Sequence, residues 1–78
     1  MLKKSPTLII TFATTTQAMA VESFCARENL PGRLIPVPRE ITAGCGLSWK
    51  ARPEDRDRLV AALTEAGMKW AECHIIEV

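Results

Sequence analysis

The chain has 78 residues, of which 47% are hydrophobic and 24% charged, and its formal net charge is +1. This length is enough for one domain and too short for two, and the composition excludes a disordered chain or one that coats nucleic acid. We therefore expect a single domain over residues 1–78 with a small core, since a chain of this size buries only about 60% of its unfolded surface.

The number of cysteines indicates the compartment. Cys25, Cys45 and Cys73 cannot all pair within one molecule, and small secreted domains that depend on disulfides usually carry an even number. We therefore expect a reducing, cytoplasmic location.

A signal peptide is the alternative for the first 20 residues. Lys3 and Lys4, the apolar residues 8–13 and the Ala18-Met19-Ala20 triplet imitate its three regions. The apolar run has six residues, whereas a signal peptide needs about 7 to 15 and a membrane-spanning helix roughly 20. The same residues also fit a strand and a helix, and we favour that interpretation.

The first half of the chain predicts a strand, a helix and a second strand. Residues 7–12 are rich in β-branched side chains, as in a buried strand. Thr14 and Gln17 have the spacing of a capping box, which predicts a helix start there, and Leu30-Pro31-Gly32 is expected to end that helix. Residues 33–37 predict a strand at a sheet edge, because the nitrogen of Pro36 cannot donate a hydrogen bond.

The second half of the chain again predicts a strand, a helix and a strand. Residues 47–51 predict a third strand. Pro53, followed by two acidic residues, is typical of a helix start, and Gly67 of a helix end. Residues 69–78 predict the last strand.

The order βαββαβ predicts an α+β, ferredoxin-like sandwich. With right-handed crossovers, its four-stranded antiparallel sheet has the order 4-1-3-2 and carries both helices on one face. The second strand then lies at an edge, in agreement with Pro36. The connection over 38–46 is longer than the usual two to five residues of a hairpin loop and lies at the end of the sheet where the first helix begins. It is therefore the first candidate functional segment.

A thiol is the most reactive group of this connection. Cys45 lies between Gly44 and Gly46, which offer no side chain to obstruct an incoming atom, and Pro38 shapes the start of the loop. A helix N-terminus favours an anion, so we expect Cys45 to be available as a thiolate, with Arg39 as a second stabilising charge. The alternative is a tight turn in which Cys45 is only a small residue.

Residues 36–41 (PVPREI) and 44–47 (GCGL) resemble the P-x-P-R-x-I-x-x-G-C-G signature of the DUF3343 family of selenium or sulfur carrier-like proteins. The resemblance implies that Cys45 accepts sulfur or selenium as a persulfide or selenosulfide and delivers it to a partner enzyme. The partners it implies are a donor like a cysteine desulfurase and an acceptor in selenium or sulfur metabolism. The C-P-x-P motif of related sulfur carriers is absent.

The other candidate residues have simpler interpretations. Cys25 lies on the apolar stripe of the first helix and is expected in the core. Cys73 and His74 are neighbours on a strand and point to opposite faces, so we expect neither a metal site nor a cofactor there; Cys73 as a resolving thiol is a minor alternative. Trp49 and Trp70 pack in the core or lie on the sheet face without helices, where a second copy of the chain could dock.

Several functions remain open from the sequence. A covalent carrier comes first, and a non-covalent regulatory or protein-interaction module of the same fold is the main alternative. A metal chaperone is disfavoured by having one well-displayed soft ligand. A stand-alone enzyme has the least support, because no paired carboxylates, nucleophile with a local base or glycine-rich phosphate loop is apparent. We expect no nucleic-acid or membrane partner.

Overall fold

The computed structural model describes residues 5–41 and 44–77. Its strands are β1 (Pro6–Thr11), β2 (Arg33–Pro36), β3 (Leu47–Ala51) and β4 (Cys73–Glu77), and its helices are α1 (Thr15–Arg27) and α2 (Arg56–Glu65), the latter preceded by the 3-10 turn η1 (Pro53–Asp55). Lys3, Lys4 and Val78, which entered the predictions above, lie outside the described residues.

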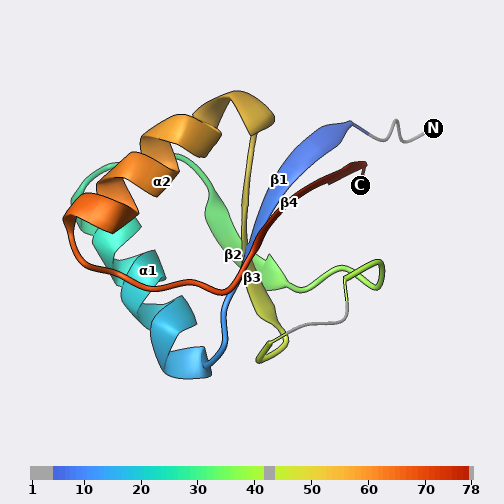
Figure 1. Cartoon of the computed structure of the whole chain (residues 1–78), viewed down its shortest axis with the longest axis horizontal. Helices are drawn as coiled ribbons and strands as arrows, with labels where there is room; N and C mark the ends of the chain where they lie inside the picture. The colour runs from blue at the N-terminus through green and yellow to red at the C-terminus, as the bar shows by residue number, and fades with distance from the viewer. Residues whose placement is uncertain (1–4, 42–43, 78) are drawn as a thin grey trace.

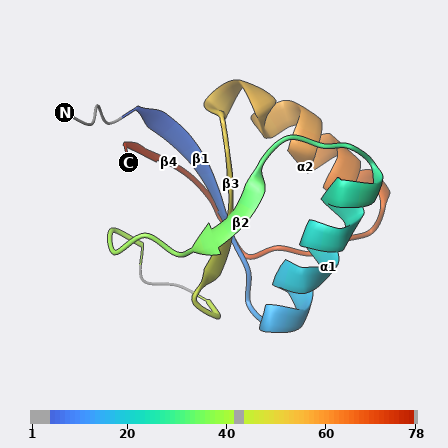
Figure 2. The same cartoon turned by 180° about the vertical axis from the view of Figure 1, so that it is seen from behind.

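The sheet has the predicted topology. Its strand order is β2-β3-β1-β4 and all three pairings are antiparallel, which is the order 4-1-3-2 counted from the other edge. Both helices lie on one face of the sheet (Figures 1 and 2). The predicted α+β, ferredoxin-like sandwich is therefore confirmed, including the edge position of Pro36 in β2.

The core lies between the sheet and the helices, and β1 is its centre. Five of the six residues of β1 are buried, because β1 has a strand on each side and helices over one face. Burying one aliphatic side chain of this size stabilises a fold by about 1.5 to 3 kcal/mol. The buried cluster consists of Leu8, Ile10, Phe12, Ala18, Val21, Cys25, Trp49, Ala51, Leu59 and Leu63.

Helix α1 ends earlier than predicted. Its last residue is Arg27, and Asn29 adopts a left-handed conformation with φ of 57°. The N–H of Leu30 then donates to the carbonyl of Cys25 at 2.9 Å, which is the hydrogen bond of a Schellman motif. Asn29, rather than the proline and glycine that follow, terminates the helix.

The end of α2 was predicted correctly, but the start of the last strand was wrong. Gly67 has φ of 72°, and the N–H of Met68 donates to the carbonyl of Leu63 at 2.9 Å, as in a second Schellman motif. Strand β4 begins only at Cys73, because residues 68–72 cross from α2 to the end of β1. There the N–H of Ala71 donates to the carbonyl of Thr11 at 2.8 Å.

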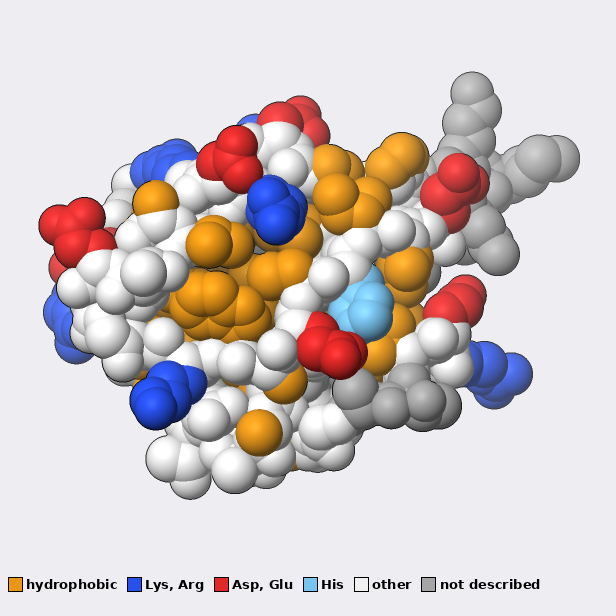
Figure 3. Space-filling model, in the orientation of Figure 1, with side chains coloured by type: hydrophobic (Ala, Val, Ile, Leu, Met, Phe, Trp, Pro, Cys, Tyr) orange, Lys and Arg blue, Asp and Glu red, His pale blue; other side chains and the backbone are white. Residues whose placement is uncertain are grey.

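Neither tryptophan lies on the sheet face away from the helices. Trp49 is 3% exposed within the core cluster, and Trp70 packs against the same cluster. Apolar side chains instead reach the surface between α2 and β4 (Figure 3). Ile75 of β4 is 53% exposed. Within residues 5–41 and 44–77, no helix is long and apolar enough to cross a membrane.

Candidate functional site

The backbone of the Gly-Cys-Gly turn is hydrogen-bonded to the residue that follows β1. The N–H of Cys45 donates to the carbonyl of Phe12 at 3.1 Å, and the N–H of Val37 donates to the carbonyl of Gly46 at 2.9 Å. Phe12 is two residues before Thr14, the N-cap of α1. The loop therefore holds Cys45 beside the segment that leads from β1 into α1.

The predicted capping residues Thr14 and Gln17 fix the start of α1, although the Gln17 side chain reaches back to Ala13 and not to the N-cap Thr14 as in a regular capping box. The hydroxyl oxygen of Thr14 accepts from the N–H of Gln17 at 3.1 Å, and the Gln17 side-chain oxygen accepts from the N–H of Ala13 at 3.0 Å. The N–H groups of Thr15 and Thr16 belong to the first turn, where a helix offers no carbonyl four residues back. The partial positive charge of the helix dipole is therefore concentrated at this end.

The two glycines of the turn serve different purposes. Gly44 has φ of 70° and Gly46 has φ of 90°, a region that L side chains rarely adopt. A Cβ at Gly44 would overlap the carbonyl of Phe12, whereas a Cβ at Gly46 would meet no atom within 4 Å. Gly44 is thus required for the close approach of the turn to β1. The sequence did not indicate that Phe12 belongs to the site, because Phe12 contacts Cys45 through its backbone carbonyl, a group that every residue has.

The Cys45 side chain is half-buried and packs against the core cluster. Its sulfur lies 4.0 Å from the carbonyl oxygen of Leu47, at the limit of a weak S–H hydrogen bond. The sequence suggested a thiol displayed on an open loop. The structure differs because the hydrogen bond to Phe12 draws the turn against the edge of the core, so that Cys45 keeps only part of its surface exposed.

Burial suppresses ionisation of the other two thiols. Cys25 is 1% exposed, and burial raises its pKa to about 11. Burial also raises the pKa of Cys73, although the charge of Arg56 and a hydrogen bond from Trp70 oppose this effect. Both thiols therefore remain protonated at neutral pH.

Cys73 is too far from Cys45 to form a disulfide with it as a resolving thiol. All three cysteines are free. Cys73 pairs with Ile10 on one side of β1, and Cys45 lies on the side of β1 next to β3. Two inter-strand spacings amount to roughly 10 Å, beyond the about 4.4 to 6.8 Å between the Cα atoms of a disulfide.

The earlier part of the loop contains Pro38 and Arg39. The carbonyl of Pro38 accepts from the N–H of Ile41 at 3.0 Å, and Ile41 is buried. Arg39 is exposed, and among the described residues no hydrogen bond or ion pair joins it to Cys45. Thr42 and Ala43, which complete the predicted loop, lie outside the described residues.

His74 lies on the sheet face away from the helices. It pairs with Ile9 across the strands, and its ring nitrogen lies 2.9 Å from a carboxylate oxygen of Glu72. Cys73 packs toward the helices, so the two neighbours point to opposite faces as predicted. In the part of the chain that the structure describes, no three His, Cys, Asp or Glu side chains are grouped to hold a metal ion.

A family model described as putative Se/S carrier protein-like matches residues 7–75. The chain belongs to this family. The match runs from β1 into β4 and includes the whole connection that carries Cys45, which confirms the resemblance seen in the loop signature. No curated protein and no solved structure shows a significant match to the chain.

Proposed function

We propose that this member of the Se/S carrier protein-like family carries sulfur or selenium covalently on Cys45. The observation that supports the proposal most strongly is the contrast among the three thiols. Cys25 is buried in the core, and Cys73, although partly exposed, lies within strand β4 and has its pKa raised by burial. Cys45 is partly exposed on a turn between two exposed glycines, and this turn is hydrogen-bonded beside the start of α1. Family membership supports the same chemistry.

In the loading step, the Cys45 thiolate attacks the terminal sulfur of a donor persulfide. A new S–S bond forms to Cys45 while the donor's S–S bond breaks, and its electron pair leaves on the donor thiolate. The proton of the donor's terminal S–H group stays with the transferred sulfur, so Cys45 becomes a persulfide without net oxidation or reduction. A selenium atom would transfer in the same way as a selenosulfide.

In the delivery step, a nucleophile of the acceptor attacks the terminal sulfur or selenium. The bond to Cys45 breaks, and the electron pair returns to the Cys45 thiolate, which is then ready for another cycle. The carrier needs no general base of its own in either step. The donor would be an enzyme like a cysteine desulfurase, and the acceptor an enzyme of sulfur or selenium metabolism.

The start of α1 and Arg39 would stabilise the anion of this cycle. Each first-turn N–H of α1 carries a partial positive charge, and the fastening of Cys45 to Phe12 keeps the thiol beside that end of the helix. Arg39 is exposed on the same loop, and its long side chain could approach the terminal sulfur anion. Its contribution would be electrostatic and would weaken with added salt.

Intact-mass spectrometry after incubation with a cysteine desulfurase and free cysteine tests the proposal. The wild-type protein should gain one sulfur atom, which a reductant removes. Cys45→Ser should gain none, and Cys73→Ser, the matched control that removes an equally half-buried thiol in β4, should gain one as the wild type does. Equal loading of Cys45→Ser would refute the assignment of the carrier thiol to Cys45.

A further inference from the structure

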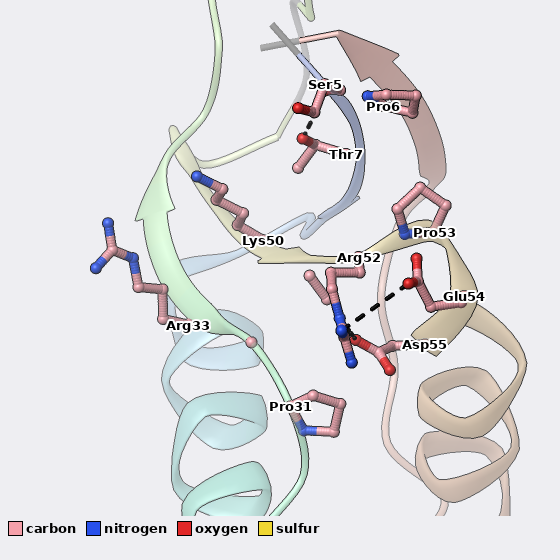
Figure 4. Close-up of a pocket in the computed structure, with 12 residues that line it drawn as sticks. Ser5, Pro6, Thr7, Pro31, Arg33, Lys50, Arg52, Pro53, Glu54 and Asp55 are labelled. Carbon is pink, nitrogen blue, oxygen red and sulfur yellow. Dashed lines mark hydrogen bonds and ion pairs between the residues drawn. The ribbon is translucent and has the colours of Figure 1, made fainter. Parts of the chain in front are cut away.

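A cleft of about 820 Å³ lies at the end of the sheet opposite Cys45. It is bordered by the start of β1, the start of β2, and the segment that leads from β3 into η1 (Figure 4). β1 has six residues and spans roughly 17 to 20 Å, so a ligand in this cleft would not reach the thiol. The cleft is therefore a separate feature of the molecule.

Two cations on one side of the cleft have no acidic partner among residues 5–41 and 44–77. Arg33 and Lys50 are directly opposite each other across β2 and β3, and Figure 4 shows their side chains leaving the strands on the same side. Like charges in such a pair destabilise a sheet. In the described part of the chain, neither cation has a carboxylate within 4.0 Å. The repulsion is thus uncompensated within that part.

The third cation of the cleft is already paired. The Arg52 side chain lies 3.3 Å from a carboxylate oxygen of Asp55 and 3.9 Å from one of Glu54, and these acids are on the far side of the cleft from Arg33 and Lys50 (Figure 4). The acidic residues of the cleft are therefore occupied by Arg52. Arg33 and Lys50 are therefore the cations of the cleft that are available to an anion, as far as the described residues show.

The wall that carries the cation pair is rigid. Gly32 has φ of 110°, and a Cβ there would lie 2.5 Å from the carbonyl oxygen of Lys50. The indole N–H of Trp49 donates to the carbonyl of Pro31 at 3.0 Å, and Trp49 is buried. The backbone therefore holds the strand positions of Arg33 and Lys50 opposite each other, so that both side chains start from one wall of the cleft.

We propose that this cleft binds a small molecule that carries a phosphate group. Arg33 would form paired hydrogen bonds to the phosphate oxygens and Lys50 would add a point charge. Three proline rings, those of Pro6, Pro31 and Pro53, also line the cleft and offer apolar surface to the body of the ligand. The volume falls within the about 300 to 1,000 Å³ of small-molecule sites, which favours a nucleotide-sized ligand over a macromolecule.

Calorimetric titration with adenosine 5′-monophosphate tests the proposal on the full chain at low ionic strength. We expect saturable binding with a Kd of about 1 mM or tighter, competition by inorganic phosphate, and much weaker binding of adenosine. Arg33→Gln and Lys50→Gln should each weaken binding by about tenfold or more, as expected for a lost charged hydrogen bond. Arg58→Gln, which removes an exposed cation outside the cleft, should bind as the wild type does.

Measurements of stability and of sulfur loading separate a loss of ligand binding from a loss of folding and from an effect on Cys45. Because Arg33 and Lys50 repel each other, neither Gln variant should be less stable than the wild type, and both should still gain sulfur on Cys45. The proposal is overturned by the absence of saturation below roughly 10 mM, by equal binding of adenosine, or by unchanged affinity in both Gln variants. None of these results would bear on the thiol.

Discussion

Replacing Gly44 by alanine should detach the Gly-Cys-Gly turn from β1. At φ of 70°, an L side chain is strained, and the added Cβ would also overlap the carbonyl of Phe12. The turn must then move outward, which breaks the hydrogen bond from the N–H of Cys45 to that carbonyl. Gly67→Ala is a matched control, since Gly67 has φ of 72° and a Cβ there would meet nothing within 4 Å.

Both variants place an alanine in a left-handed backbone conformation, but only Gly44→Ala adds a steric overlap with Phe12. A left-handed conformation costs an L residue about 1 to 2 kcal/mol, and this cost applies to both Gly44→Ala and Gly67→Ala. Only Gly44→Ala adds the loss of a hydrogen bond, with a polar group left unpaired, at about 1 to 3 kcal/mol. We expect a difference of about 2 kcal/mol in the free energy of unfolding, or roughly 8 to 16 °C in Tm for a domain of this size.

Urea denaturation measures the difference in the free energy of unfolding between the two variants. The rate at which Cys45 is alkylated at neutral pH shows whether the change also affects the thiol. In Gly44→Ala the thiol should alkylate at a changed rate and accept sulfur more slowly, whereas Gly67→Ala should retain wild-type values for both. If the two variants lose equal stability, the close approach of Gly44 to Phe12 contributes nothing and the reasoning fails. If Gly44→Ala accepts sulfur at the same rate as the wild type, the hydrogen bond between Cys45 and Phe12 has no role in sulfur loading.

Three further predictions concern the scaffold. Thr14→Ala removes the N-cap of α1 and should lower the free energy of unfolding by about 1 kcal/mol; unchanged urea midpoints would contradict this. Between pH 9.0 and 11 the folded protein keeps the proton of Cys25 that the unfolded chain loses, so stability should fall with rising pH by up to about 1.4 kcal/mol per unit, and Cys25→Ala should show a shallower fall. Trp49→Phe leaves the carbonyl of Pro31 without its indole donor and should cost about 1 to 3 kcal/mol, measured by thermal unfolding.

Local sequence signals were sufficient to predict the topology. Pro36 indicated an edge strand because a missing N–H is a property of the residue itself, and Thr14 with Gln17 indicated a helix start because both partners of the capping box lie within one turn. Combined with the handedness of the crossovers, these signals led to the sheet order that the structure confirms. The position of β4 was predicted less well, since Ala71 and Glu72 are held by Thr11, a contact distant in sequence.

The features that could not be predicted depend on register. The sequence indicates that Cys45 precedes a strand, but not that its N–H meets the carbonyl of Phe12, because a shift of one residue between β1 and β3 would bring a different carbonyl there. The opposition of Arg33 and Lys50 depends in the same way on the register of β2 against β3. One antiparallel strand, β3, thus carries the Gly-Cys-Gly turn before its first residue and half of the cation pair near its last. Its pairing with both neighbours therefore fixes the two proposed sites at opposite ends of one rigid sheet, where each can be altered without disturbing the other.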